Sequence, residues 1–147
     1  MRKVIYFVLF ILIIPALIEA QATPAPFTEE EVRQFINEYK ERFVRLDLDA
    51  YMALFSVEAA ENRMLPYADI QMAYKRTIAL SQSIQYQMKI YSIQTYAKSA
   101  FVQGRYEILQ AFKKGGKARL MRGDIQWVLV REDGSLKIRE INYGKDR

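Results

Sequence analysis

The residues able to carry out chemistry are few, because the chain contains neither histidine nor cysteine. Without histidine it lacks the usual general base at neutral pH, the base of a serine triad and the commonest metal ligand. Without cysteine it has no thiol nucleophile and no disulfide. Acid–base catalysis would have to rest on carboxylates, and the candidates are Glu61, Glu107 and Asp124. Each would need burial to raise its pKa into a useful range. We predict no metal site and no cofactor.

The N-terminus has the pattern of an export signal. Arg2 and Lys3 precede an apolar run over residues 4–18, and residues 20–22 (Ala-Gln-Ala) fit the cleavage site of a signal peptidase. An uncleaved anchor would need about 20 apolar residues, whereas this run has 15 and contains Pro15. The sequence therefore predicts a periplasmic or secreted protein with no stable membrane anchor after cleavage. The predicted segments are a signal peptide (1–22), a linker (23–27) and one domain (28–147).

Cleavage would leave about 125 residues, which is enough for one domain with its own core. The net charge of +5 would fall to about +4, because the signal removes two positive charges and one negative charge. This charge is modest, and together with export it argues against a nucleic-acid partner.

Helices are predicted in the first half of the domain. Thr28 and Glu31 have the spacing of a capping box, with Phe27 and Val32 placed as a hydrophobic staple across it. Asp47 is placed to cap a second, shorter helix, and an irregular piece over residues 62–66 precedes a third. The apolar positions recur at helical spacing: Val32, Phe35, Ile36, Tyr39, Phe43 and Leu46; then Tyr51, Leu54 and Phe55; then Ile70, Ala73, Tyr74, Thr77 and Ile78.

Strands are predicted in the second half. Apolar and polar residues alternate over residues 84–90, which is typical of a half-buried strand, and three further strands follow. Turns are predicted at residues 114–117, where two glycines supply positive φ, and at residues 132–135. Helices followed by an antiparallel meander predict an α+β fold with the helices on one face of the sheet. The further strands cover roughly residues 100–112, 118–131 and 135–143.

Three segments resemble the nuclear transport factor 2-like family, which includes ketosteroid isomerase and SnoaL-like cyclases. They are residues 35–39 (Phe-Ile-Asn-Glu-Tyr), residues 47–55, ending in Leu-Phe, and residues 127–138. The resemblance implies a cone-shaped α+β fold, in which N-terminal helices pack in a curved antiparallel sheet and a pocket lies at the open end. The fold hosts enzymes, binding proteins and assembly domains, so it does not give the function.

The resemblance also implies positions for a site. Tyr39 falls where isomerase-type members carry a tyrosine that holds the substrate oxygen, although its place on the apolar stripe favours a core residue with its hydroxyl at the rim of the pocket. Arg63 falls where their carboxylate base lies, and an arginine stays protonated and cannot act as a base. The position of their protonated acid falls at Asp124 or Gln126. Arg122, Asp124 and Gln126 share one face of a strand, which is either a polar pocket wall or a solvent or dimer face.

We therefore predict an exported, non-catalytic domain that binds a small molecule or acts as an accessory interaction module. The expected ligand is amphipathic or anionic, and the residues expected to bind it are Tyr39, Arg63, Arg122, Asp124 and Gln126. The alternatives are a carboxylate-dependent enzyme of the isomerase, dehydratase or cyclase type, and a purely structural dimerisation module. A homodimer is predicted because residues 121–130 carry apolar side chains on both faces of a strand.

Overall fold

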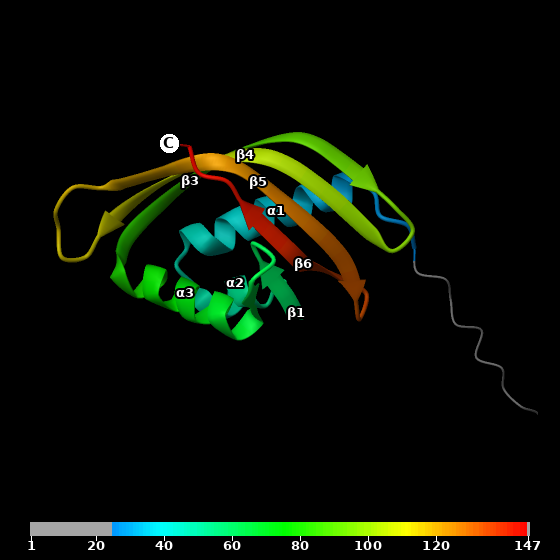
Figure 1. Cartoon of the computed structure of the whole chain (residues 1–147), viewed down its shortest axis with the longest axis horizontal. Helices are drawn as coiled ribbons and strands as arrows, with labels where there is room; N and C mark the ends of the chain where they lie inside the picture. The colour runs from blue at the N-terminus through cyan, green and yellow to red at the C-terminus, as the bar shows by residue number, and fades with distance from the viewer. Residues whose placement is uncertain (1–24, 147) are drawn as a thin grey trace, which may run out of the picture.

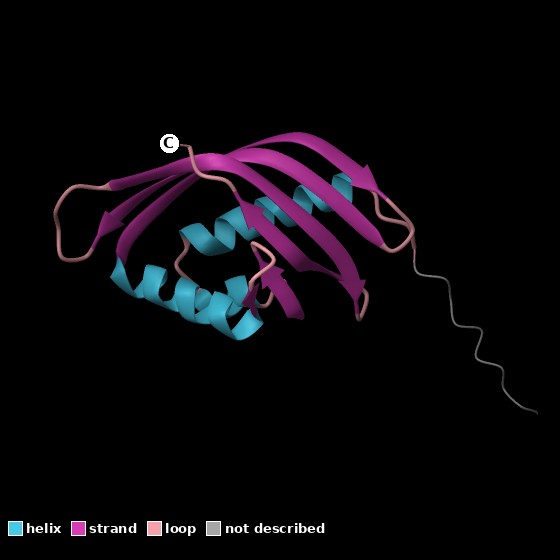
Figure 2. Ribbon diagram, viewed as in Figure 1, coloured by secondary structure: helices cyan, strands magenta, loops and turns pink. Residues whose placement is uncertain are grey.

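A computed structural model describes residues 25–146 as a six-stranded sheet that curves around three helices. The helices all lie against the concave face of the sheet, and the outer face is free of them (Figure 1, Figure 2). The predicted signal peptide and the start of the linker fall outside the described residues. Within residues 25–146, no helix is long and apolar enough to cross a membrane.

The first two helices begin where their caps were predicted. The Thr28 hydroxyl accepts the N–H of Glu31 at the start of α1 (Glu29–Val44), and the Asp47 carboxylate accepts the N–H of Ala50 at the start of α2 (Leu48–Met52). The predicted stripe of α1 is buried from Val32 to Phe43. On α3 (Tyr67–Leu80), Ile70 is fully buried, whereas Ala73 faces solvent.

The sheet has the order β2-β1-β6-β5-β4-β3, and its last four strands along the chain form the predicted antiparallel meander. Gly115, Gly116 and Gly134 have positive φ in the two predicted turns. The strands are β1 (Phe55–Glu61), β2 (Leu65–Pro66), β3 (Ser81–Thr95), β4 (Ser99–Phe112), β5 (Arg119–Glu132) and β6 (Ser135–Tyr143).

The sequence pattern did not predict the first strand. Phe55 was assigned to the second helix, but that helix ends at Met52 and Phe55 begins β1. β1 runs parallel to β6, with Phe55 opposite Ile138, and the N–H of Ile138 donates to the carbonyl of Leu54 at 2.8 Å. This pairing joins residues more than eighty positions apart, so local periodicity cannot reveal it.

The two faces of β5 have opposite surroundings. Ile125, Trp127 and Leu129 are buried against the helices, and the ring of Trp127 lies edge-on to the ring of Tyr39 with centroids 5.7 Å apart. The sequence left open which way this face points, and the structure places it inward. The outer face of β5 is polar at its centre, and its apolar side chains lie towards its two ends, at Leu120 and at Val128 and Val130. The homodimer therefore stays a prediction, and β5 offers it fewer outward-facing apolar side chains than the sequence suggested.

Candidate functional site

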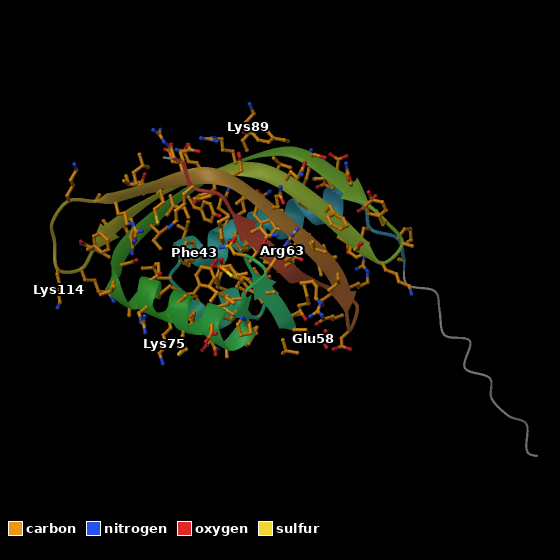
Figure 3. The ribbon with its side chains drawn as sticks, viewed as in Figure 1. Phe43, Glu58, Arg63, Lys75, Lys89 and Lys114 are labelled. Atoms are coloured by element: carbon orange, nitrogen blue, oxygen red, sulfur yellow. The ribbon has the colours of Figure 1, made fainter. Side chains whose placement is uncertain are left out.

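Five tyrosines meet inside the cone, and we call them the tyrosine cluster: Tyr39, Tyr51, Tyr74, Tyr86 and Tyr143. Each comes from a different element, namely α1, α2, α3, β3 and β6 in that order. Tyr39 is central, because its ring centroid lies 5.1 Å from that of Tyr51 and 6.0 Å from that of Tyr86. Phe43, labelled between the helices and the sheet in Figure 3, packs edge-on against Tyr74 with centroids 5.6 Å apart. The helices and sheet thus bring phenol groups together from across the whole domain.

The hydroxyl of Tyr143 connects the cluster. It lies 2.7 Å from the hydroxyl of Tyr39 and 2.6 Å from that of Tyr74, so the three form a short chain of hydrogen bonds. The hydroxyls of Tyr51 and Tyr86 are buried and have no hydrogen-bond partner among the described residues. A buried polar group without a partner costs about 1–3 kcal/mol, and such groups in native proteins often mark sites with a further role.

Burial keeps these phenols in their neutral form. It raises the pKa of all five hydroxyls well above the usual tyrosine value, and the neighbouring phenols add to the effect. A neutral phenol retains its O–H, so at neutral pH each member of the cluster can donate a hydrogen bond. The cluster is therefore a group of hydrogen-bond donors in apolar surroundings, suited to an oxygen atom of a ligand.

Glu61 lies at the edge of the cluster, at the end of β1. It pairs in register with Ile141 of β6, whose side chain is fully buried in the core. Adjacent paired residues of a sheet point to the same face, which directs Glu61 inward. Burial raises the pKa of the Glu61 carboxyl, and the Tyr74 hydroxyl opposes part of this effect. Glu61 is only partly buried, so the cluster reaches the surface beside it.

Glu61→Gln is expected to stabilise the domain increasingly as the pH rises. The pKa of Glu61 is raised in the folded state, so above pH 4.5, its ordinary pKa, the folded protein holds this proton more tightly than the unfolded chain. The wild type therefore loses stability as the pH rises through the window between the two pKa values, and glutamine removes that loss. Urea unfolding from pH 4 to pH 8 measures this difference in unfolding free energy between the variant and the wild type. Glu107→Gln, an exposed carboxylate on the outer face, should leave the pH dependence almost unchanged.

The structure separates the five predicted site residues. Tyr39 is fully buried at the centre of the cluster, whereas the Arg63 side chain is 84% exposed and lies 3.5 Å from the carboxylate of Glu140. Arg122, Asp124 and Gln126 project from the outer face of β5, away from the helices. Of the five, Arg63 and Gln126 line one hollow on that outer face, and Arg122 and Asp124 lie apart from it.

Arg122 and Asp124 instead belong to a charged group near the C-terminus. The guanidinium of Arg105 lies 3.4 Å from the carboxylate of Asp124 and also contacts Asp146, and the Arg122 guanidinium lies 3.8 Å from Asp146. This group bridges β4, β5 and the segment after β6. Asp124 and Glu107 are both exposed on the outer face, so neither is a carboxylate enclosed in a pocket.

From the sequence, Glu61 was one of three candidate carboxylates for catalysis, and Tyr39 was the only member of the cluster expected to bind a ligand. Two signals pointed further. Tyrosine is the commonest aromatic residue of the chain, with ten copies. Tyr51, Tyr74 and Tyr86 also fall on the predicted buried faces of their elements. Tyr143 had no such signal, because it stands at the very end of the last strand.

Comparison with solved structures identifies the architecture. A ketosteroid isomerase-like protein from Erwinia carotovora atroseptica superposes with a TM-score of 0.66 at 19% identity, covering 82% of this chain and 99% of that one. A nuclear transport factor 2-like superfamily protein from Salmonella enterica gives a TM-score of 0.70 at 16% identity, covering 80% and 90%. The chain has the nuclear transport factor 2-like fold. A hexachlorocyclohexane dehydrochlorinase gives a TM-score of 0.67 at 9% identity, covering 80% and 84%.

No protein-family model matches the chain, and no curated protein matches it in sequence. Proteins of the nuclear transport factor 2-like fold at such low identity share the backbone path and not necessarily the chemistry. The structural neighbours include an isomerase-like protein and a dehydrochlorinase, so the fold is compatible with catalysis and with binding. The function must be argued from the tyrosine cluster and Glu61.

Proposed function

We propose that this is an exported domain that binds a small, mostly apolar molecule carrying one oxygen function, at the tyrosine cluster beside Glu61. The observation that carries the proposal is the meeting of five tyrosine hydroxyls, two of them buried without a partner, next to a carboxyl of raised pKa. An apolar site with a few convergent polar groups is the usual form of a small-ligand site.

The chemistry of the site favours a hydrogen-bond acceptor as the oxygen of the ligand. Neutral phenols donate, and a carboxyl of raised pKa is more often protonated and donates as well. A ketone, a phenol or a protonated acid group suits these donors. Arg63 lies outside the cluster and pairs with Glu140, so a fixed positive charge does not contribute to the proposed site.

Binding is expected to raise the melting temperature by several degrees at ligand concentrations far above Kd, because a ligand that binds only the folded state stabilises it by about 2.7 kcal/mol at 100 times Kd. The measurement is a thermal-shift screen of aromatic ketones, phenols and medium-chain fatty acids. Tyr143→Phe and Glu61→Gln should each reduce the shift for the compound that binds. Arg63→Ala is the matched control and should leave the shift intact.

Two results would contradict the proposal. One is the absence of any shift from all three compound classes. The other is a shift that Arg63→Ala removes and that Tyr143→Phe and Glu61→Gln leave unchanged, since such a ligand would bind on the outer face.

A second candidate function is proton transfer on the bound molecule, favoured by the position of Glu61. A carboxylate whose pKa is raised towards neutrality is the form suited to general-base catalysis, and buried phenols are placed to stabilise a developing negative charge on oxygen. Incubation of a binding ketone in D2O distinguishes the two functions. Exchange of the protons next to its carbonyl that Glu61→Gln abolishes, with binding retained, indicates catalysis. Binding without exchange indicates a binding domain.

A further inference from the structure

A hollow of about 200 Å³ lies on the outer face of the sheet, away from the tyrosine cluster. In Figure 3 this face is marked by Lys89, which projects from the sheet on the side opposite the helices. The hollow crosses four strands, from β3 to β6, and Arg63 in the turn after β1 closes one side. It is independent of the proposed small-ligand site, because the whole thickness of the sheet separates them.

Two rows of side chains cross the strands in register and form the floor of the hollow. In the first row Ser92 pairs with Gln103, Gln103 with Gln126, and Gln126 with Asn142. The second row, one step along the strands, consists of Gln94, Phe101, Val128 and Glu140. Four neighbouring strands span about 14 Å at the usual spacing of about 4.8 Å. The floor is therefore an extended track that runs across the strands.

The first row is polar and uncharged. An amide side chain offers two N–H donors and an acceptor oxygen, and a hydroxyl offers one O–H donor and an acceptor oxygen. Asn142 donates to Glu140 at 2.7 Å, whereas the amides of Gln103 and Gln126 take no part in side-chain hydrogen bonds within residues 25–146. The middle of the track thus presents two neighbouring amides that are free to bind a partner.

The second row supplies an aromatic surface and no unpaired charge. Phe101 is 44% exposed and is held edge-on by Tyr96, with ring centroids 5.7 Å apart. The Tyr96 hydroxyl in turn donates to Gln94 at 3.2 Å. Glu140, the acidic residue of the hollow, lies 3.5 Å from the guanidinium of Arg63, its basic residue. An exposed aromatic ring beside free amides recognises a molecule that has both hydroxyl groups and C–H faces.

The neighbouring hollow on the same face differs in charge. It is lined by Lys89, Arg105 and Arg122 with a single carboxylate, Glu107, and would favour an anion. The amide-lined hollow carries one residue of each sign, and these are paired. The chemistry that fits it is therefore neutral.

We propose that the amide-lined hollow is a binding site for a neutral oligosaccharide, lying across the strands along Gln103 and Gln126 with one sugar ring against Phe101. Sugar hydroxyls both donate and accept, as the amides do, and the C–H face of a pyranose packs on an aromatic ring. A chain of sugars matches an extended track whose two charged residues, Arg63 and Glu140, are paired with each other.

The test is titration of the full mature domain with the tetrasaccharides of glucose (cellotetraose and maltotetraose) and of N-acetylglucosamine, followed by NMR shift mapping and calorimetry. At least one is expected to bind with a Kd of about 1 mM or tighter, and the shifted amides should belong to β3–β6 of the hollow. The double variant Gln103→Ala/Gln126→Ala should weaken binding about tenfold or more, and Phe101→Ala should weaken it as well. Gln85→Ala, an exposed glutamine on the same face but outside the hollow, is the matched control and should bind like the wild type.

Three results would overturn the proposal. The first is no binding of any of the three tetrasaccharides. The second is equal weakening by Gln85→Ala and by the double variant, which would mean a non-specific effect. The third is a homodimer in sedimentation velocity that Gln126→Arg dissociates, because this face would then be occupied by a second copy of the chain.

Discussion

Trp127→Ala is expected to cost about 3–5 kcal/mol of unfolding free energy. A domain of this kind has a total stability of about 5–15 kcal/mol, so the variant should be near the limit of folding at 37 °C. The expected cost is large because of where the Trp127 side chain lies as well as because of its size. Trp127 is 1% exposed at the centre of the inner face of β5, and its ring packs edge-on against Tyr39 of α1. Its removal leaves a cavity between the sheet and α1, and neither element can move in easily to fill it.

Chemical denaturation of three variants checks this expectation. Trp127→Phe should cost clearly less than Trp127→Ala, because it keeps an aromatic ring and deletes an indole N–H that has no hydrogen-bond partner among the described residues. Gln126 precedes Trp127 and faces outward, so Gln126→Ala should change the free energy of unfolding by less than about 1 kcal/mol. Similar losses for Gln126→Ala and Trp127→Ala would mean that the outward and inward faces of β5 have been assigned the wrong way round.

The parts of the fold that the sequence predicted are those decided by neighbouring residues. The cap of α1 needs only Thr28 and Glu31, and the hairpin turn needs only Gly115 and Gly116, so both could be read locally. β1 could not be read, because it is held by parallel pairing with β6 rather than by its own pattern. The resemblance to the nuclear transport factor 2-like fold supplied the cone shape that these local signals left undetermined.

The candidate site was harder to predict than the fold, because it depends on where a short turn sends two side chains that are two positions apart in the sequence, Glu61 and Arg63. Asn62 and Arg63 both have positive φ, which is rare for residues other than glycine. The turn directs Arg63 outward to Glu140 and leaves Glu61 on the inward face of β1. Counting positions along the chain placed Arg63 at the base position of the site and left Glu61 as a candidate carboxylate outside it. Only the backbone of the turn reverses that assignment.

Gly123→Ala is expected to destabilise the domain by about 3 kcal/mol, at the upper end of what overpacking costs, and to disturb the tyrosine cluster. A Cβ on Gly123 would lie 2.1 Å from the carbonyl oxygen of Gly144, which is backbone and cannot rotate away. The segment after β6 is fixed there, because the N–H of Gly144 donates to the carbonyl of Asp124 at 2.8 Å. Displacing Gly144 displaces Tyr143, whose hydroxyl joins Tyr39 to Tyr74.

The matched control for this prediction is Gly144→Ala, which adds a methyl group on the other side of the same contact, in the segment after β6. A Cβ there would meet its nearest atoms of Asp124 at 3.6 to 3.8 Å, which is ordinary van der Waals distance, so little stability should be lost. The two variants should also differ in ligand binding. Gly123→Ala should weaken the thermal shift from any compound that binds the tyrosine cluster, because Tyr143 is moved, whereas Gly144→Ala should retain it. If Gly123→Ala melts like the wild type and binds like it, the segment after β6 does not pack against β5, and Tyr143 is not held in the cluster by the backbone on its C-terminal side.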